Sequence, residues 1–181
     1  MKRITIISIL LLSMTLFGNT QQVSLDSILP VESGKIKYRD VINVPETEAR
    51  TLYNKAIEWL NIFFVNAREI TKTRNPNDGI IEGETRIQLV DTVDGTVIKS
   101  KQVFYRFTFE FKENRFRYTI TEFTVKGNSK FPLEQWIDTE SPFYSESNRG
   151  YLIQIKTYMD DFISSFTSYM TKPEEEEDDD W

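Results

Sequence analysis

The chain contains no cysteine and no histidine among its 181 residues. Without cysteine it has no disulfide framework, no thiolate metal site, no cysteine nucleophile and no lipidated cysteine. Without histidine it lacks the commonest general base and the commonest metal ligand. Any catalysis would therefore depend on Asp, Glu, Lys, Ser, Thr or Tyr. The sequence predicts no catalytic residue, no metal ligand and no cofactor.

An excess of positive charge is also lacking. The chain has 22 Lys and Arg residues against 28 Asp and Glu residues, which gives a formal net charge of −6. Seven of the acidic residues stand together in residues 174–180, while Lys2 and Arg3 lie at the other end of the chain. The segment between is therefore close to neutral and lacks the broad basic field that nucleic-acid binding requires. We expect no nucleic-acid partner.

The N-terminus has the pattern of an export signal. Lys2 and Arg3 form a short positive region, and residues 4–17 are a nearly continuous apolar run. The run is shorter than the roughly 20 residues of a membrane-spanning helix, and its length is typical of a signal peptide. We expect a signal peptide over residues 1–20, a periplasmic or extracellular location, and no stable membrane span after cleavage. An uncleaved membrane anchor is the alternative.

Residues 21–33 are interpreted as a polar linker, and residues 34–171 as a single domain. Residues 34–45 are predicted to be the first strand, because apolar residues such as Ile36 and Ile42 stand at even-numbered positions and so share one face. Val41 has the other parity, so either both faces are partly covered or a bulge intervenes. Thr47 is a candidate N-cap for a helix whose apolar stripe continues to Ala67. Residues 72–79 are then expected to be a turn-rich loop.

Residues 80–112 predict the first of two hairpins. A two-residue loop at Asp94 and Gly95 and a three-residue loop that adds Val93 are both possible. We choose the three-residue loop because it keeps one face apolar and places Glu82 opposite Arg106. Its register also pairs residues 85 with 103, 83 with 105, and 81 with 107.

The second hairpin turns at Glu113 and Asn114, because Asn tolerates the left-handed conformation. This register pairs Phe111 with Phe116 and Glu110 with Arg117 on opposite faces, so one face is aromatic and the other charged. It leaves Glu122 on the apolar face and Phe123 on the polar face. Two explanations are open: a bulge near Thr121, which we favour, or an exposed apolar patch of Phe104, Phe123 and Val125.

A second amphipathic helix begins near Ser145 and ends at Pro173, with Phe162 and Phe166 in its apolar stripe. Residues 131–137 are a possible short edge strand. The predicted fold class is α+β: a curved antiparallel sheet of about four strands in the order β-α-β-β-β-α, with two helices on one face. Residues 172–181 are expected to be an acidic disordered tail.

Several segments resemble a known family: "PVESGKIKYRDVINVP", "LYNKAIEWL", "GIIEGE" and "FTFEFKENRFRYTITEF". They are similar to uncharacterised domains described as having a TBP-like (TATA-binding-protein-like) fold, found in exported proteins of gut-dwelling Gram-negative bacteria. The resemblance covers roughly residues 30–125. Family members tend to have an acidic residue and Gly where this chain has Glu113 and Asn114. The resemblance implies a fold and an exported location, but no catalytic residue, no ligand and no DNA binding.

Three functions are compatible with the sequence. The first is a non-catalytic binding or accessory module of the cell envelope, whose partner is an envelope or secreted protein or a glycan. The second is a carboxylate-dependent hydrolase at Glu82 and Glu84, which share one strand face. The third is a structural assembly protein that acts through its acidic tail. The contact surface predicted for the first function consists of Phe104, Arg106, Glu110, Arg117, Thr119, Thr121 and Phe123.

Overall fold

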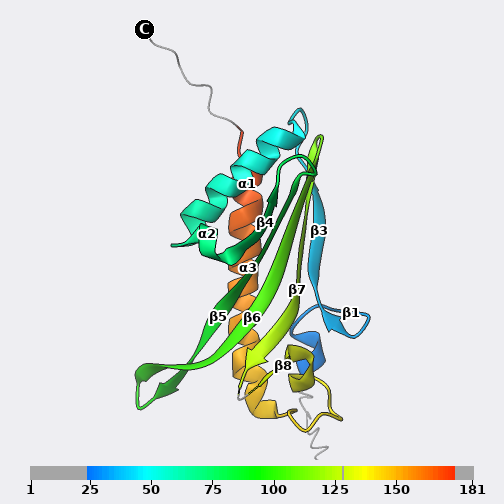
Figure 1. Ribbon diagram of the computed structural model, residues 1–181. Coiled ribbons are helices and arrows are strands. Elements are labelled where there is room, and N and C mark those ends of the chain that lie inside the picture. Colours follow the sequence, from blue (N-terminus) through cyan, green and yellow to red (C-terminus); the bar gives the residue numbers. More distant parts are fainter. Residues whose placement is uncertain (1–23, 128, 174–181) are drawn as a thin grey trace, which may run out of the picture.

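The computed structural model describes residues 24–127 and 129–173 (Figure 1). Its elements are, in chain order, η1 (Leu25–Ser27), β1 (Val31–Glu32), β2 (Lys35–Ile36), β3 (Tyr38–Asn43), α1 (Ala49–Phe63), α2 (Ala67–Ile70), β4 (Thr71–Asn75), β5 (Ile80–Val93), β6 (Thr96–Lys112), β7 (Arg115–Lys126), β8 (Lys130–Pro132), η2 (Leu133–Trp136), η3 (Glu146–Asn148) and α3 (Arg149–Thr171). The main sheet is antiparallel with strand order β3-β7-β6-β5-β4, and β8 pairs with β7. Helices α1 and α3 lie on the same face of this sheet (Figure 1).

The predicted α+β class is confirmed, but the sheet has six strands where we expected about four. The additional strands are β4 and β8, at the two sides of the sheet. Strand β4 lies in the segment expected to be a loop, and it pairs with β5 from Asn75 opposite Ile80. Its side chains alternate between half-buried and exposed positions. Such an edge strand is held by backbone hydrogen bonds on one side, so its sequence needs no apolar alternation.

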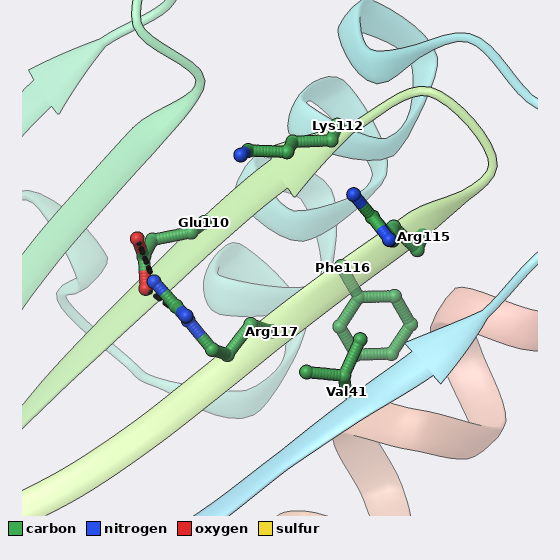
Figure 2. A pocket seen from close by; sticks show the side chains of 6 residues that line it. All are labelled: Val41, Glu110, Lys112, Arg115, Phe116 and Arg117. Carbon is green, nitrogen blue, oxygen red and sulfur yellow. Dashed lines mark hydrogen bonds and ion pairs between the residues drawn. The ribbon is translucent and has the colours of Figure 1, made fainter.

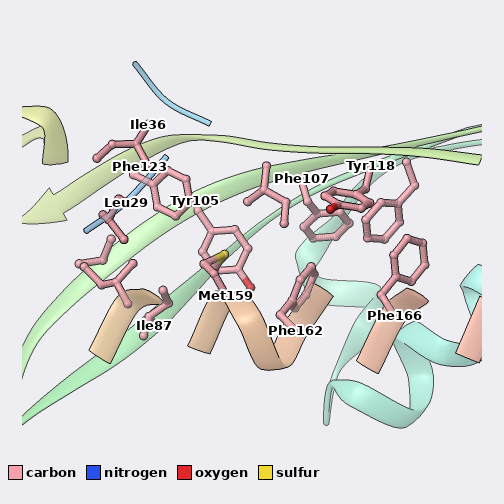
Figure 3. Packing of buried hydrophobic residues seen from close by; sticks show 14 of the residues in the cluster. Leu29, Ile36, Ile87, Tyr105, Phe107, Tyr118, Phe123, Met159, Phe162 and Phe166 are labelled. Carbon is pink, nitrogen blue, oxygen red and sulfur yellow. The ribbon is translucent and has the colours of Figure 1, made fainter. Parts of the chain in front are cut away.

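The core is an aromatic layer between the sheet and the two long helices (Figure 3). Trp59 of α1 packs edge-on against Phe162 of α3, with ring centroids 5.1 Å apart. Phe109 of β6 stacks on Phe166 at 4.1 Å. All four side chains are at most 1% exposed. The apolar stripes predicted for the two helices therefore form the core, as their spacing indicated.

Helix α1 differs from the sequence prediction at both ends. Thr47 is not the N-cap; the N-cap position is held by Glu48, whose side chain makes no capping hydrogen bond. The Ala49 amide instead donates to Oε1 of Glu113 in the β6–β7 turn, at 3.2 Å. The helix ends at Phe63, and the chain is extended at Phe64 before the short helix α2. A carboxylate distant in sequence thus provides the cap that we expected from a local residue.

The β6–β7 hairpin has the predicted register. Phe111 lies opposite Phe116 and Glu110 opposite Arg117, and the chain turns at Glu113 and Asn114. Asn114 adopts the left-handed conformation with φ of 63°. Its side-chain oxygen also accepts a hydrogen bond of 3.2 Å from the Thr47 amide, which ties the turn to the start of α1.

Replacing Asn114 by alanine should lower the free energy of unfolding by about 1–2 kcal/mol, because alanine disfavours the left-handed conformation and cannot accept from Thr47. The matched variant Asn114→Gly also loses the hydrogen bond, but glycine adopts the left-handed conformation without strain. It should therefore lower the free energy of unfolding by less than about 1 kcal/mol. Urea denaturation of both variants measures the difference. Equal costs for the two variants would contradict a conformational role for Asn114.

The β5–β6 hairpin departs from the predicted register. Val93 pairs with Thr96, so the loop has two residues, Asp94 and Gly95, and both have positive φ. The ladder shifts between Gln88 and Val90, where Ser100 and Lys101 together stand opposite Leu89. The three-residue loop was chosen because it keeps one face of the hairpin apolar. The two-residue loop together with this bulge puts the same side chains on that face.

Because of that shift, the predicted pairs of the β5–β6 ladder are displaced by two residues. Gly83 lies opposite Phe107, and Glu84 instead of Glu82 lies opposite Arg106. The apolar face is nevertheless the one that we predicted, since Ile81 and Phe107 are both fully buried.

The favoured bulge near Thr121 is present. The β6–β7 ladder shifts between Phe104 and Arg106, and Glu122 takes a left-handed conformation with φ of 55°. The shift turns Phe123 into the core, where it is 1% exposed, and leaves Glu122 at the surface. The alternative of an exposed patch that includes Phe123 and Val125 is wrong.

Part of the expected linker packs on the domain. Leu25 and Leu29 are both 2% exposed and belong to the core, and β1 pairs with β2 in a small separate sheet. Residues 24–33 are therefore not a polar linker, because their few apolar side chains cover one end of the core. The expected signal peptide, residues 1–20, and the acidic residues 174–181 lie outside the described residues.

Candidate functional site

The face of the sheet opposite the helices carries the candidate site. Even-numbered residues of β6 from Phe104 to Lys112 point to this face, because the odd-numbered ones from Val103 to Phe111 are buried under the helices. Partners on β5, β7 and β3 share the face through the ladder. We call it the open face. Six of the seven predicted contact residues lie on it: Phe104, Arg106, Glu110, Arg117, Thr119 and Thr121.

The seventh predicted contact residue, Phe123, does not lie on the open face. Its ring stacks on Tyr105 in the core at a centroid distance of 5.8 Å, because the bulge at Glu122 reverses its direction. Phe104 does lie on the open face and is half-buried there. Nζ of Lys130 lies 4.1 Å from the centre of the Phe104 ring. The aromatic contact patch predicted from these two rings is therefore reduced to Phe104.

Arg106 is the centre of an ion-pair network at the β8 end of the open face. Its guanidinium lies 3.0 Å from Glu122 and 3.9 Å from Glu84, and Glu84 in turn lies 3.6 Å from Lys130. Charges of both signs are thus balanced within the network. Such half-exposed pairs contribute little stability, and they leave no charge available to recognise a ligand.

A cavity of about 240 Å³ lies at the other end of the open face, beside the β6–β7 turn (Figure 2). Glu110 and Arg117 form a two-point ion pair in it, and Nε of Arg117 donates to Oε2 of Glu110 at 2.5 Å. This hydrogen bonding raises the pKa of Arg117 above its ordinary value. The full lining is Val41, Glu110, Lys112, Arg115, Phe116 and Arg117.

Lys112 and Arg115 are the unbalanced charges of this cavity. They lie directly opposite each other on β6 and β7, and both are exposed. Within residues 24–127 and 129–173, neither has an ion-pair partner. Like charges directly opposite in a ladder destabilise the sheet. A carboxylate or phosphate bound between them would relieve this repulsion and gain charge-assisted hydrogen bonds.

Four residues that line the cavity were not among the predicted contact residues: Val41, Lys112, Arg115 and Phe116, the last of which was predicted for the aromatic face. Lys112 and Arg115 were paired in the predicted hairpin, but their like charges were attributed to an exposed turn. Val41 contributes an apolar wall and is 48% exposed. Its odd number was the signal in the sequence. In a strand, Val41 points to the face opposite that of Ile36 and Ile42, and this is the open face.

Glu82 and Glu84 line a second cavity of about 320 Å³ on the open face, together with Lys72, Gly83 and Arg106. Oε2 of Glu82 accepts a hydrogen bond of 2.9 Å from the Thr73 hydroxyl, and Glu84 belongs to the Arg106 network. Glu82 is not opposite Arg106 as predicted, because the ladder is displaced. Both carboxylates have structural partners, so the arrangement favours no hydrolase, and that hypothesis stays a prediction.

Neither a metal centre nor a membrane span is found in the part of the chain that the structure describes. No three Asp or Glu residues there are grouped so that they could hold an ion. The helices of the same segments are too short or too polar to cross a bilayer.

Comparison with known proteins supports the fold. Residues 38–126 match the model of a family described as "Domain of unknown function (DUF4468) with TBP-like fold". A TBP-like protein from Parabacteroides distasonis superposes with a TM-score of 0.65 at 12% identity, over 81% of this chain and 99% of that one. A DUF4468 family protein from Bacteroides ovatus gives a TM-score of 0.65 at 14% identity, over 81% and 92%. No curated protein matches the sequence.

Proposed function

The chain contains a DUF4468 domain with a TBP-like fold, and from this premise we propose that it is an exported, non-catalytic binding module that recognises an anionic group. The location follows from the signal-peptide pattern of residues 1–20. The partner is an envelope or secreted molecule, either a protein or a glycan, that carries carboxylate or phosphate groups. The cavity beside the β6–β7 turn is the binding site.

One observation carries the proposal: Lys112 and Arg115, two cations that have no ion-pair partner among the described residues, converge on one cavity. Arg117 is neutralised by its pairing with Glu110, which also holds its side chain in place in the cavity. Arginine can bind a carboxylate or phosphate through two parallel hydrogen bonds, while lysine acts as a point charge. Val41 offers an apolar contact beside these polar groups, as small-molecule and glycan sites generally do.

The same cavity does not indicate a nucleic-acid site. Glu110 lies inside it, and Glu82, Glu84 and Glu122 are distributed over the rest of the open face. Nucleic-acid binding needs a basic surface that follows several phosphates, whereas acidic side chains lie among the cations of this face. We therefore propose a ligand with a localised charge.

The test is a titration of the ¹⁵N-labelled full chain at about 50 mM salt, where surface charges are weakly screened. Three probes separate the possible sources: an oligogalacturonate for acidic glycans, a glutamate-rich peptide for acidic proteins, and a neutral maltooligosaccharide as control. We expect amide shifts at Val41, Lys112, Arg115 and Phe116 with an anionic probe and none with the neutral one. A short single-stranded DNA tests the exclusion of nucleic acid.

The matched variants are Lys112→Glu/Arg115→Glu in the cavity and Arg68→Glu/Lys99→Glu elsewhere on the surface. All four side chains are exposed, so both double variants should fold, and both change the net charge by the same amount. We expect the cavity variant to weaken binding of the anionic probe by at least about tenfold, because two charge-assisted contacts are lost. Equal binding by both variants would show that the probe responds to net charge alone and would overturn the proposed site.

A further inference from the structure

The acidic segment 174–181 is the one strongly charged part of the chain that the proposed function does not use. We propose that it docks on the cavity of Lys112 and Arg115 in the same molecule and occludes it. The inference rests on the proposed function in that both concern the same cavity. It makes the binding module self-regulating, because an external anionic partner must displace the chain's own carboxylates.

Charge complementarity favours this occupant. Residues 174–180 are seven consecutive carboxylates, and Lys112 and Arg115 are exposed cations that lie directly opposite each other in one cavity and have no ion-pair partner among the described residues. A tethered segment meets its site at an effective concentration in the millimolar range. Contacts that would be weak between separate molecules are therefore sufficient to keep the site occupied.

The geometry allows the contact. Helix α3 ends at Thr171, and the carbonyl of Lys172 accepts a hydrogen bond of 2.6 Å from Nζ of Lys55 in α1. At the start of α1, the Thr47 carbonyl accepts a hydrogen bond of 2.9 Å from Asn114 in the β6–β7 turn. The end of α3, the start of α1 and this turn consequently lie at one end of the molecule (Figure 1).

The length of the segment is sufficient for this path. The path follows α1 back from Lys55 to Ala49, about 9 Å at 1.5 Å per residue. It then passes from the helix layer around the turn to the open face, roughly 10 Å further, which is one helix diameter. Eight extended residues span at most about 26–29 Å. The carboxylates of residues 178–180 can thus reach Lys112 and Arg115.

The last residue of the segment also fits the cavity. Trp181 follows the acidic residues directly, and Val41 is a half-exposed apolar side chain on the cavity wall. An indole ring is amphipathic and stacks well against apolar groups and guanidinium planes. We place the Trp181 ring against Val41 and the adjacent carboxylates between the two cations.

The experiment uses a spin label on the full chain. Because the chain has no cysteine, Glu177→Cys gives a single attachment point and keeps Trp181 and six of the acidic residues. We expect paramagnetic broadening of the amides of Val41, Lys112, Arg115 and Phe116 at about 50 mM salt. Most of it should disappear at 1 M salt, where the Debye length falls to about 3 Å. The Lys112→Glu/Arg115→Glu variant should lose it and Arg68→Glu/Lys99→Glu should keep it.

Other broadening patterns would overturn the inference. Broadening around Lys55 and Tyr169 alone would mean that the segment stays at its point of attachment. Broadening that also appears when a labelled, ¹⁴N copy is mixed with an unlabelled, ¹⁵N copy would assign the contact to a second molecule. An absence of broadening at the cavity would likewise contradict docking.

A second measurement separates this inference from the proposed function. The oligogalacturonate titration is repeated on a chain that ends at Pro173, and removal of the tail should strengthen binding about threefold to tenfold because a competitor at millimolar effective concentration is lost. Equal binding by both chains overturns the inference and leaves the proposed function intact. Binding by neither chain overturns the proposed function, whereas the spin-label result still decides whether the tail docks.

Discussion

Replacing Phe162 by alanine should lower the free energy of unfolding by about 3–5 kcal/mol, the range for removing a buried phenylalanine from a core. The ring is 1% exposed and lies where the two helices and the sheet meet. Its centroid is 5.1 Å from that of Trp59, 5.3 Å from Phe63 and 5.9 Å from Tyr105. Aromatic neighbours fixed on a helix and on a strand, α1 and β6, cannot move together to fill the cavity that alanine would leave.

Urea denaturation followed by circular dichroism measures the effect, and Ile153→Ala on the same helix is the control. Ile153 is 50% exposed on the outer face of α3, so its truncation should change stability by no more than about 0.5 kcal/mol. A loss of several kcal/mol is large against the 5–15 kcal/mol by which domains are usually stable. Similar losses for both variants would mean that the aromatic layer does not hold the helices to the sheet.

The elements that the sequence predicted correctly are those in which apolar side chains alternate or recur. The β6–β7 hairpin is the clearest case, because Phe109 and Phe111 had to share a face with Phe116 and Tyr118. A slip of one residue would have placed all of these rings in water. The amphipathic stripes of α1 and α3 were predictable for the same reason.

Elements held by the backbone alone were not predictable in this way. Strand β4 is polar, and it is ordered by its ladder to β5 and not by side-chain burial. The bulge at Ser100 and Lys101 was also missed, because a two-residue loop followed by a one-residue bulge puts the same side chains on the apolar face as a three-residue loop does, so the apolar pattern does not distinguish the two. The cap of α1 by Glu113 comes from a residue 64 positions away, and no local pattern can indicate such a contact.

The candidate site was predicted in part for the same physical reason. The pairing of Glu110 with Arg117 followed from the hairpin register, and it forms the centre of the cavity. The wall formed by Val41 depended on where β3 joins the sheet, which is beside β7. That neighbour relation is long-range, so the sequence set Val41 apart from Ile36 and Ile42 by its parity but could not place it next to Arg117.

Replacing Gly83 by alanine is the second large effect that we expect, at about 1–3 kcal/mol toward the upper end of that range. A Cβ at this position would lie 2.5 Å from Cε1 of Phe107 and 2.7 Å from the carbonyl oxygen of Ile70. The Phe107 ring is fully buried and has no free space to enter. The Ile70 oxygen belongs to the backbone where α2 meets β4, so it cannot give way without moving that edge of the sheet.

Gly150→Ala provides the matched control for this last variant. Gly150 lies in the first turn of α3, and a Cβ added there meets no atom within 4 Å. The same Gly-to-Ala change should therefore stabilise the protein by about 0.5–1 kcal/mol, because alanine loses less backbone entropy in a helix than glycine does. Thermal or urea denaturation of the two variants should shift in opposite directions. A neutral Gly83→Ala would show that Phe107 does not lie directly over Gly83, and hence that the β5–β6 ladder has a different register.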